Sequence, residues 1–257
     1  MLSNRVIADF CRRPLVTIVT VVYNAEDTII DTILSVLSQT YSNIEYIVVD
    51  GASTDSTPLI IDGFSDKIDV IVREPDDGIF DAMNKGLKLA TGDYINFMNA
   101  GDTFVNPQVI ESIFSSLEEP ADFIYGHTIF NRKGKLSASR LNPFFDVRGV
   151  CAMGICHQSI FLNTKLANKY PFDTSFLIAA DYNMIFSVFK YENPKVFYYD
   201  KAIAIFEADD GISSRNYTKS FMEIIRIYHF RSVIDKFIFL VISYVKYAVL
   251  HVINKYR

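Results

Sequence analysis

The sequence predicts an α/β fold, in which a mostly parallel β-sheet carries helices on both of its faces. Between residues 15 and 102, four short apolar runs rich in β-branched residues alternate with three segments of helical periodicity. Strands that alternate with helices in this way form parallel sheets with right-handed crossovers. Each apolar run also ends in small and polar residues. Because ligands of open α/β sheets bind beyond the carboxyl ends of the strands, we expect these polar ends to converge on one site.

The elements of this first half follow from local patterns. The run 15–22 is β-branched almost throughout, as expected of a central strand buried on both faces. Apolar residues at spacings of three and four predict the helices, and Ser53 or Thr54 is expected to cap the second of them. The expected strands are 15–22, 46–50, 69–72 and 94–98, and the expected helices are 29–37, 59–61 and 79–90.

The alternation becomes less regular after residue 102. A polar turn with a glycine at 131–134 predicts a β-hairpin there, and from residue 217 onward the pattern is helical and amphipathic. The remaining expected elements are a helix at 107–117, strands at 122–130, 156–162 and 196–207, and a helix at 180–189.

Composition limits the classes of protein that fit. A chain of 257 residues, half of them hydrophobic, suits one large domain or a domain with an appendage. Its three cysteines have neither metal-finger spacing nor an even number for disulfides, which favours a reducing compartment, and residues 1–13 lack the apolar core of a secretory signal. The formal net charge of −5 argues against a general nucleic-acid-binding protein.

The charge is unevenly distributed along the chain. Residues 219–257 carry seven Lys or Arg and two Asp or Glu, a net of +5, whereas the rest of the chain has 18 basic and 28 acidic residues. The apolar stretch 237–253 is 17 residues long with Lys246 near its middle, and a membrane span needs ~20 apolar residues. An in-plane helix at the inner face of the cytoplasmic membrane fits better. Packing of this helix on the protein itself or on a second copy, as a homo-oligomer, is an open alternative.

Five segments occur in an order and spacing that resemble a known family. They are Pro14–Glu26, Val48–Asp55, Lys85-Gly86, Ala90–Tyr94 and Asn99–Asp102. Together they resemble the family 2 glycosyltransferases, which have the Rossmann-like GT-A fold. The segment Asp77–Gly86 and the ending Asn-Ala-Gly-Asp look like the subgroup that builds bacterial surface polysaccharides.

The resemblance implies an enzyme that transfers a sugar from a nucleotide-sugar to an acceptor hydroxyl, with inversion at the anomeric carbon. UDP-sugars are the favoured donors and GDP-sugars are an alternative, and the acceptor is a lipid-linked or growing glycan. It implies a GT-A domain at 1–215, with a nucleotide-sugar-binding half at 14–102 and an acceptor half at 103–215, followed by a helical segment at 216–257. The protein is expected to be cytoplasmic and peripheral at the membrane.

The residues that match the family's donor site come from the strand ends. The implied donor-binding residues are Val22, Tyr23, Asn24, Glu26, Asp50, Arg73, Lys85, Asn99, Ala100 and Gly101. A carboxylate such as Asp50 accepts hydrogen bonds from base or ribose, and Arg73 can grip phosphate oxygens. The structural alternatives are a turn at Asn24, a capping role for Asp50 or Asp55, and a solvated charge at Lys85. Gly86 is expected to allow close helix–strand packing.

Two carboxylates match the family's catalytic positions. Asp102 matches the last acid of the Asp-x-Asp motif, which holds Mg²⁺ or Mn²⁺ against the donor diphosphate. This sequence departs from that motif, because position 100 is alanine and Asp102 is its only acid. Asp181, at an expected helix start, matches the general base that takes the proton of the acceptor hydroxyl. A helix N-cap is the structural alternative for Asp181.

Other polar residues permit both functional and structural interpretations. His157-Gln158 could contact acceptor or phosphate, although a histidine bonded within the core is the alternative, and Cys156 is expected to pack as a thiol. Ser213, Ser214 and Arg215 match a mobile loop that closes over the diphosphate. A nucleotide-sugar-binding or assembly protein without catalysis is the second hypothesis, supported by the missing acid at position 100. A dinucleotide-dependent dehydrogenase is disfavoured, because no Gly-x-Gly-x-x-Gly follows the first strand.

Overall fold

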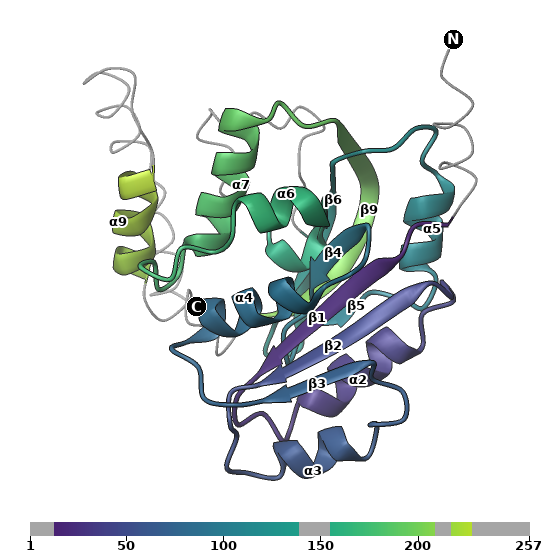
Figure 1. Cartoon of the computed structure of the whole chain (residues 1–257), viewed down its shortest axis with the longest axis vertical. Coiled ribbons are helices and arrows are strands. Elements are labelled where there is room, and N and C mark those ends of the chain that lie inside the picture. Colours follow the sequence, from purple (N-terminus) through teal and green to yellow (C-terminus); the bar gives the residue numbers. More distant parts are fainter. Residues whose placement is uncertain (1–12, 139–154, 209–216, 228–257) are drawn as a thin grey trace.

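The computed structural model describes residues 13–138, 155–208 and 217–227 (Figure 1). The strands are β1 (Val16–Val22), β2 (Ile44–Asp50), β3 (Val70–Arg73), β4 (Tyr94–Phe97), β5 (Thr103–Phe104), β6 (Phe123–Arg132), β7 (Lys135–Ala138), β8 (Ile160–Asn163) and β9 (Val196–Glu207). The helices are α2 (Ile29–Leu37), α3 (Thr57–Asp62), α4 (Ile79–Leu89), α5 (Val109–Ser115), α6 (Thr164–Lys169), α7 (Ala180–Tyr191) and α9 (Tyr217–Ile227), with a 3₁₀ turn η2 (His157–Ser159).

The strands form one mixed sheet in the order β3-β2-β1-β4-β8-β6-β9-β5, with β7 paired to β6. The first four strands in the chain are parallel to one another, as the sequence predicts for this half. In the second half, β8 lies antiparallel to both β4 and β6, while β9 is parallel to β6. The parallel first half and the mixed second half thus share one continuous sheet.

Two hydrophobic cores lie on opposite faces of this sheet. Strand β1 contributes to both, because Val19 and Val21 face the cluster that includes α4 and α7, whereas Ile18 and Val22 face the cluster that includes α2, α3 and α5. Figure 1 shows α4 and α2 on opposite sides of the strands. Every residue of β1 is buried, which explains its continuous β-branched composition.

Gly86 allows α4 to lie directly on the sheet. A Cβ atom at position 86 would lie 2.3 Å from Cγ1 of Val19 on β1, which is closer than two non-bonded carbon atoms can approach. The prediction that this glycine serves helix–strand packing is therefore confirmed. By contrast, the Ala90–Tyr94 motif lies at the amino end of β4, where Asp93 Oδ2 accepts a hydrogen bond from Leu15 N (2.9 Å). This motif joins β4 to β1 and lies away from the strand tips.

Some local expectations were wrong. Neither Ser53 nor Thr54 caps α3, since its N-cap residue is Ser56 and Asp55 Oδ1 accepts the Thr57 N–H at 3.0 Å. The expected strand at 156–162 begins as the 3₁₀ turn η2. Strand β5 and helix α6 were not expected, because both are short and have little periodicity of their own.

The C-terminal segment is described only as far as Ile227, so the stretch 237–253 lies outside the described residues. Helix α9 packs on the protein body: Ile227 is buried in the same core as α7, and Arg226 lies over the ring of Phe176 at 4.8 Å. Residues 217–227 thus pack on the protein body, and the two alternatives for the stretch 237–253 stay predictions. No helix among the described residues is long and apolar enough to span a bilayer.

Candidate active site

The carboxyl ends of the first three strands lie side by side. Val22, Asp50 and Arg73, the last residues of β1, β2 and β3, are register partners across the sheet. The segment after β4 continues along β1, because Ala100 N donates to Val21 O at 3.1 Å. The predicted donor-site residues at these strand ends are therefore brought to one edge of the sheet.

Asp50 and Arg73 form an ion pair at this edge. Asp50 is fully buried, and its Oδ2 accepts from Arg73 Nε at 3.1 Å while its Oδ1 accepts from Ser53 N at 2.9 Å. Arg73 also donates to Asp62 Oδ1 at 2.9 Å. Since removal of one partner from a buried pair leaves an uncompensated charge, Arg73 compensates the buried charge of Asp50. The guanidinium is committed to protein carboxylates in this arrangement.

Asn24 and Glu26 bind the neighbouring loop between β2 and α3. Asn24 has a left-handed backbone, with φ of 47°, and its Oδ1 accepts from Thr54 N at 2.8 Å. Glu26 Oε2 accepts from Ser56 N at 2.7 Å. The bond of Asn24 matches the turn that was its structural alternative, and Glu26 binds the same loop, which was not expected from the sequence. Tyr23, between them and β1, is 62% exposed and leaves its ring free to contact a ligand.

Lys85 ties α4 to the loop that follows β3. Its Nζ lies 3.0 Å from Glu74 Oε1 and 3.4 Å from Asp81 Oδ2, and it donates to Pro75 O at 2.6 Å. The turn into α4 is made by Gly78, whose φ of 111° is accessible mainly to glycine. Lys85 is thus held by three acceptors of the chain itself.

Asp102 is a buried carboxylate with a raised pKa. It is 5% exposed; its Oδ2 accepts from Gln158 Nε2 at 2.6 Å and its Oδ1 from Glu207 N at 3.1 Å. Burial raises the pKa of Asp102 to about 6, against the lowering effects of the Gln158 hydrogen bond and of nearby His157. The preceding turn is fixed by Thr32, which accepts from Gly101 N at 3.0 Å and donates to Asp102 O at 2.8 Å.

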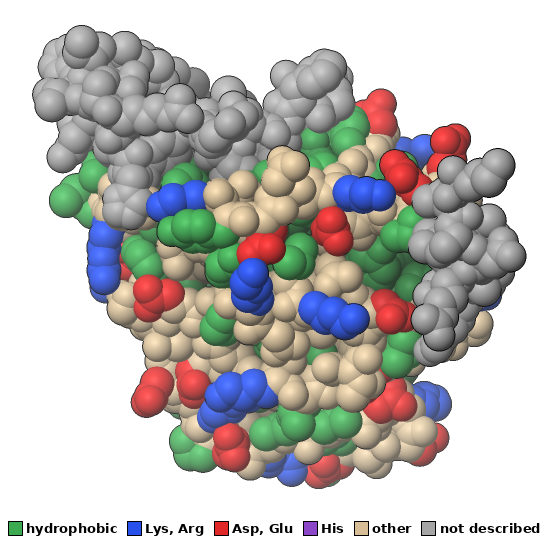
Figure 2. All heavy atoms as spheres, turned by 45° about the horizontal axis from the view of Figure 1, so that its top comes forward, with side chains coloured by type: hydrophobic (Ala, Val, Ile, Leu, Met, Phe, Trp, Pro, Cys, Tyr) green, Lys and Arg blue, Asp and Glu red, His purple; other side chains and the backbone are tan. Residues whose placement is uncertain are grey.

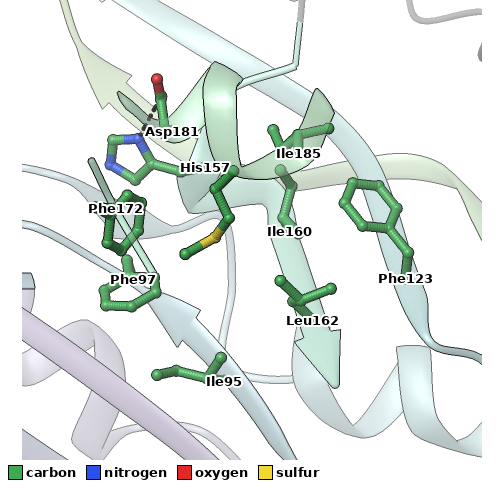
Figure 3. A pocket seen from close by; sticks show the side chains of 10 residues that line it. Ile95, Phe97, Phe123, His157, Ile160, Leu162, Phe172, Asp181 and Ile185 are labelled. Atoms are coloured by element: carbon green, nitrogen blue, oxygen red, sulfur yellow. Dashed lines mark hydrogen bonds and ion pairs between the residues drawn. The ribbon is translucent and has the colours of Figure 1, made fainter. Parts of the chain in front are cut away.

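Asp181 lies in the first turn of α7, as predicted, and belongs to a chain of hydrogen bonds (Figure 3). Its Oδ2 lies 3.0 Å from His157 Nδ1, and His157 Nε2 lies 2.9 Å from Asn99 Nδ2. An amide NH₂ donates, so Nε2 accepts and the neutral ring carries its proton on Nδ1, which donates to Asp181. His157 therefore links the motif after β4 to the start of α7.

The dipeptide His157-Gln158 contacts both candidate catalytic carboxylates. His157 bonds to Asp181 and Gln158 to Asp102, and Asn96 of β4 holds the dipeptide by donating to the carbonyls of Gln158 (2.9 Å) and Ile160 (2.8 Å). The sequence suggested that this dipeptide contacts acceptor or phosphate, or that the histidine is bonded within the core, and it did not predict bonds to the two carboxylates. The only available signal was its place between the two motifs, because neither periodicity nor spacing indicates contacts across 24 and 56 residues.

A small apolar cavity lies beneath Asp181 and His157 (Figure 3). It offers about 20 Å³ to the centre of a water molecule and is lined mainly by side chains such as Phe97, Phe172 and Ile185. A water needs polar partners to occupy such a space stably. The two polar groups thus rest on an apolar floor, where electrostatic interactions are stronger than in bulk water.

The described residues offer amide oxygens as well as one acid for a cation near Asp102. They contain no group of three His, Cys, Asp or Glu side chains arranged as a metal site. The buried Oδ1 of Asn99 and Oε1 of Gln158 have no hydrogen-bond partner among the described residues. Mg²⁺ commonly uses one or two carboxylates together with substrate phosphates and waters. This donor set fits a cation that is completed by a diphosphate.

The other flagged residues have simple outcomes. Burial raises the pKa of the Cys156 thiol to about 12, so it stays protonated and packs as expected. The loop residues Ser213, Ser214 and Arg215 lie outside the described residues. Figure 2 shows acidic and basic side chains interspersed over the described part of one face.

An α/β sheet that gathers carboxylates at the carboxyl ends of its strands is typical of enzymes that bind nucleotides. The sequence model of glycosyl transferase family 2 matches residues 17–191. The chain belongs to this family and is a nucleotide-sugar glycosyltransferase with a GT-A-like fold. The family resemblance stated from the sequence motifs is confirmed.

Two curated relatives come from bacterial glycan pathways. A PGL/p-HBAD biosynthesis glycosyltransferase of Mycobacterium bovis is 30% identical over 198 residues, covering 74% of this chain and 75% of the relative. WfgD of Escherichia coli, a UDP-Glc:alpha-D-GlcNAc-diphosphoundecaprenol beta-1,3-glucosyltransferase, is 33% identical over 184 residues, covering 70% and 71% of the two chains.

Solved structures share the fold. TarS 1-349 of S. aureus in complex with UDP superposes with a TM-score of 0.66 at 19% identity, covering 83% of this chain and 64% of that one. The mannosyltransferase PcManGT from Pyrobaculum calidifontis, in complex with GDP-Man and Mn²⁺, gives 0.61 at 18% identity, with 84% and 66% covered. This chain thus spans about two thirds of each.

Proposed function

We propose that the protein is an inverting glycosyltransferase of bacterial cell-surface glycan biosynthesis, which transfers a hexose or N-acetylhexosamine from a UDP-sugar to a lipid-linked or growing glycan. The observation that carries this proposal is that the dipeptide His157-Gln158 bonds both to Asp102, in the segment after β4, and to Asp181, in the first turn of α7. One sugar can contact both a diphosphate-binding acid and a general base only if the two carboxylates are near each other, and here two neighbouring residues each bond to one of them. The curated relatives support the choice of glycan pathway.

The nucleoside would lie over the ends of β1 and β2. Asp50 would accept hydrogen bonds from N–H or O–H groups of base or ribose, and Arg73 would pair with that carboxylate and orient it. The exposed ring of Tyr23 would provide a stacking surface. Asn24 and Glu26 would maintain the loop shape on which this pocket depends.

The diphosphate would lie at Asn99–Asp102, with Mg²⁺ or Mn²⁺ held by Asp102. The unpartnered amide oxygens of Asn99 and Gln158 would complete the protein's share of the ligands. When bound, the cation would stabilise the negative charge of the departing nucleoside diphosphate. Binding of Mn²⁺ together with GDP-Man by PcManGT supports this assignment.

Asp181 would act as the general base. As the acceptor oxygen attacks C1 of the sugar, its proton would pass to the Asp181 carboxylate. The bond from C1 to the diphosphate oxygen breaks, and its electron pair leaves with the nucleoside diphosphate. Attack from the face opposite the leaving group inverts the configuration. The proton on His157 Nδ1 would hold Asp181 Oδ2 in place during this step.

The test is release of nucleoside diphosphate from UDP- and GDP-sugars, with a lipid-linked acceptor and with or without Mg²⁺ or Mn²⁺. Asp181→Asn should lower kcat by about 10²- to 10⁴-fold, because general-base catalysis contributes that much, while the donor Kd stays within about twofold. Asp66→Asn, on the exposed surface, is the matched control and should leave both constants unchanged. Full turnover by Asp181→Asn would refute the base assignment. Donor binding without release from any donor would instead indicate a binding protein.

A further inference from the structure

The side chain of Glu223 on α9 binds the backbone immediately before α7. Its Oε1 accepts from Leu177 N at 2.9 Å, and its Oε2 accepts from Ile178 N at 2.9 Å and from Ala179 N at 3.0 Å. Three successive N–H groups thus point at one carboxylate, across 44 to 46 residues of sequence. Hydrogen bonds to an ionised acceptor are about twice as strong as neutral ones.

This contact fixes the start of the helix that carries the proposed base. Ala179 is the N-cap residue of α7 and supplies no side-chain cap, and Asp181 follows two residues later. The carboxylate of Asp181 accepts from Tyr182 N at 2.7 Å, one of the N–H groups of the first turn. The N–H groups just before the helix therefore depend on Glu223, whose negative charge also suits the positive end of the helix dipole.

Helix α9 is itself anchored, so Glu223 is held at a defined place. Arg226 lies over the Phe176 ring at 4.8 Å and donates to Ser175 Oγ at 3.3 Å, and Ile227 is 4% exposed. Figure 1 shows α9 beside the start of α7. The family match ends at residue 191, so this anchor comes from a part of the chain that the family model does not cover.

We propose that Glu223 is a positioning residue for Asp181, and that α9 is in this way part of the catalytic apparatus. By holding residues 177–179, Glu223 sets the position of the first turn of α7 and hence the bond from Asp181 to His157. The proposal rests on the role of Asp181 as the base. A displacement of about 1 Å at a reacting group can cost about 10²-fold in rate, so loss of this anchor should be visible in kcat.

The experiment compares Glu223→Ala and Glu223→Gln in the full chain with Met222→Ala, a neighbouring exposed position on α9. Glu223→Ala should lower kcat about 10- to 100-fold with the donor Kd within about twofold, and Glu223→Gln, which keeps one accepting oxygen, should recover part of the rate. Met222→Ala should match the wild type. In an Asp181→Asn background, Glu223→Ala should cause no further loss, because the group that it positions is already gone.

A readout independent of turnover separates this proposal from the proposed function. The ¹⁵N signals of the His157 ring report the tautomer held by Asp181, and they should change in both Glu223 variants and not in Met222→Ala. If the wild type releases no nucleoside diphosphate, the proposed function fails while the ring signals still decide the role of Glu223. The proposal is overturned if folded Glu223 variants keep the ring signals of the wild type. It is also overturned if Glu223→Ala lowers kcat by the same factor in the Asp181→Asn background as in the wild type.

Discussion

Replacement of Asp102 by asparagine should stabilise the ligand-free protein while abolishing metal-assisted transfer. The pKa of this buried carboxyl is raised from 3.8 to about 6 by burial, and a difference of one in pKa corresponds to about 1.4 kcal/mol. Ionisation of Asp102 therefore costs about 3 kcal/mol more in the folded state than in the unfolded chain. An asparagine fits the site once the Gln158 amide turns over, because its Oδ1 can accept from Glu207 N and its Nδ2 can then donate to Gln158 Oε1, which replaces the Nε2 that now donates to Asp102.

The sign of the pH dependence follows from proton binding. Between pH 3.8 and about 6 the folded wild type holds a proton on Asp102 that the unfolded chain releases, so its stability falls as the pH rises through this window. Asp102→Asn has no carboxyl group at this position, so its stability does not fall in this way as the pH rises. The variant should gain up to about 3 kcal/mol over the wild type at pH 8, and the difference should shrink toward pH 4.

The assay is urea unfolding of both proteins at several values between pH 4 and pH 8, without divalent cations. Addition of Mg²⁺ with a nucleoside diphosphate should then raise the Tm of the wild type more than that of Asp102→Asn, since the variant keeps the nucleoside pocket and lacks the carboxylate for the cation. An Asp102→Asn protein that is less stable than the wild type at pH 8, or a difference that does not vary with pH, would refute the reasoning.

Two further substitutions test the frame around the site. Gly86→Ala should destabilise the protein by about 1–3 kcal/mol, because its Cβ would lie 2.3 Å from Val19 Cγ1. In the Val19→Ala background, Gly86→Ala should cost less, because the clashing methyl groups are gone. An unchanged Tm for Gly86→Ala would contradict this packing. Asn96→Leu should lower kcat by about tenfold or more, since the carbonyls of Gln158 and Ile160 lose their donors and the dipeptide 157–158 can shift. Donor Kd and kcat measured together check this, and a wild-type kcat would contradict it.

The sequence was most informative where local pattern alone decides the structure. Strand β1 is buried on both faces, so its β-branched run identified it, and the strand expected at 196–207 has the same bounds as β9. The predicted helix start at Asp181 is also correct. Local pattern was insufficient for η2, whose turn is held in place by Asn96 from a distant strand.

Contacts between distant segments could not be predicted in the same way. Arg73 was expected near the phosphates or ribose of the donor, and its ion pair with the buried Asp50, which the register of β2 and β3 brings about, was not expected. The bonds of His157 to Asp181 and of Glu223 to the start of α7 depend on how the second half of the chain folds back on the sheet. A histidine or glutamate has no periodic signal that would reveal such partners.

The hydrogen bonds of Asn96 and Asn99 to the dipeptide 157–158 limit which relatives of this enzyme can be recombined into active hybrids. Donor choice would reside before residue 102 and acceptor choice after it, which makes a crossover in this region attractive for building transferases of new specificity. Such a hybrid would join two halves that meet through the pairing of β4 with β8 and through these amide bonds beside the site. Parents that agree at positions 96, 99, 157 and 158 should therefore give active hybrids more often than parents chosen by overall identity.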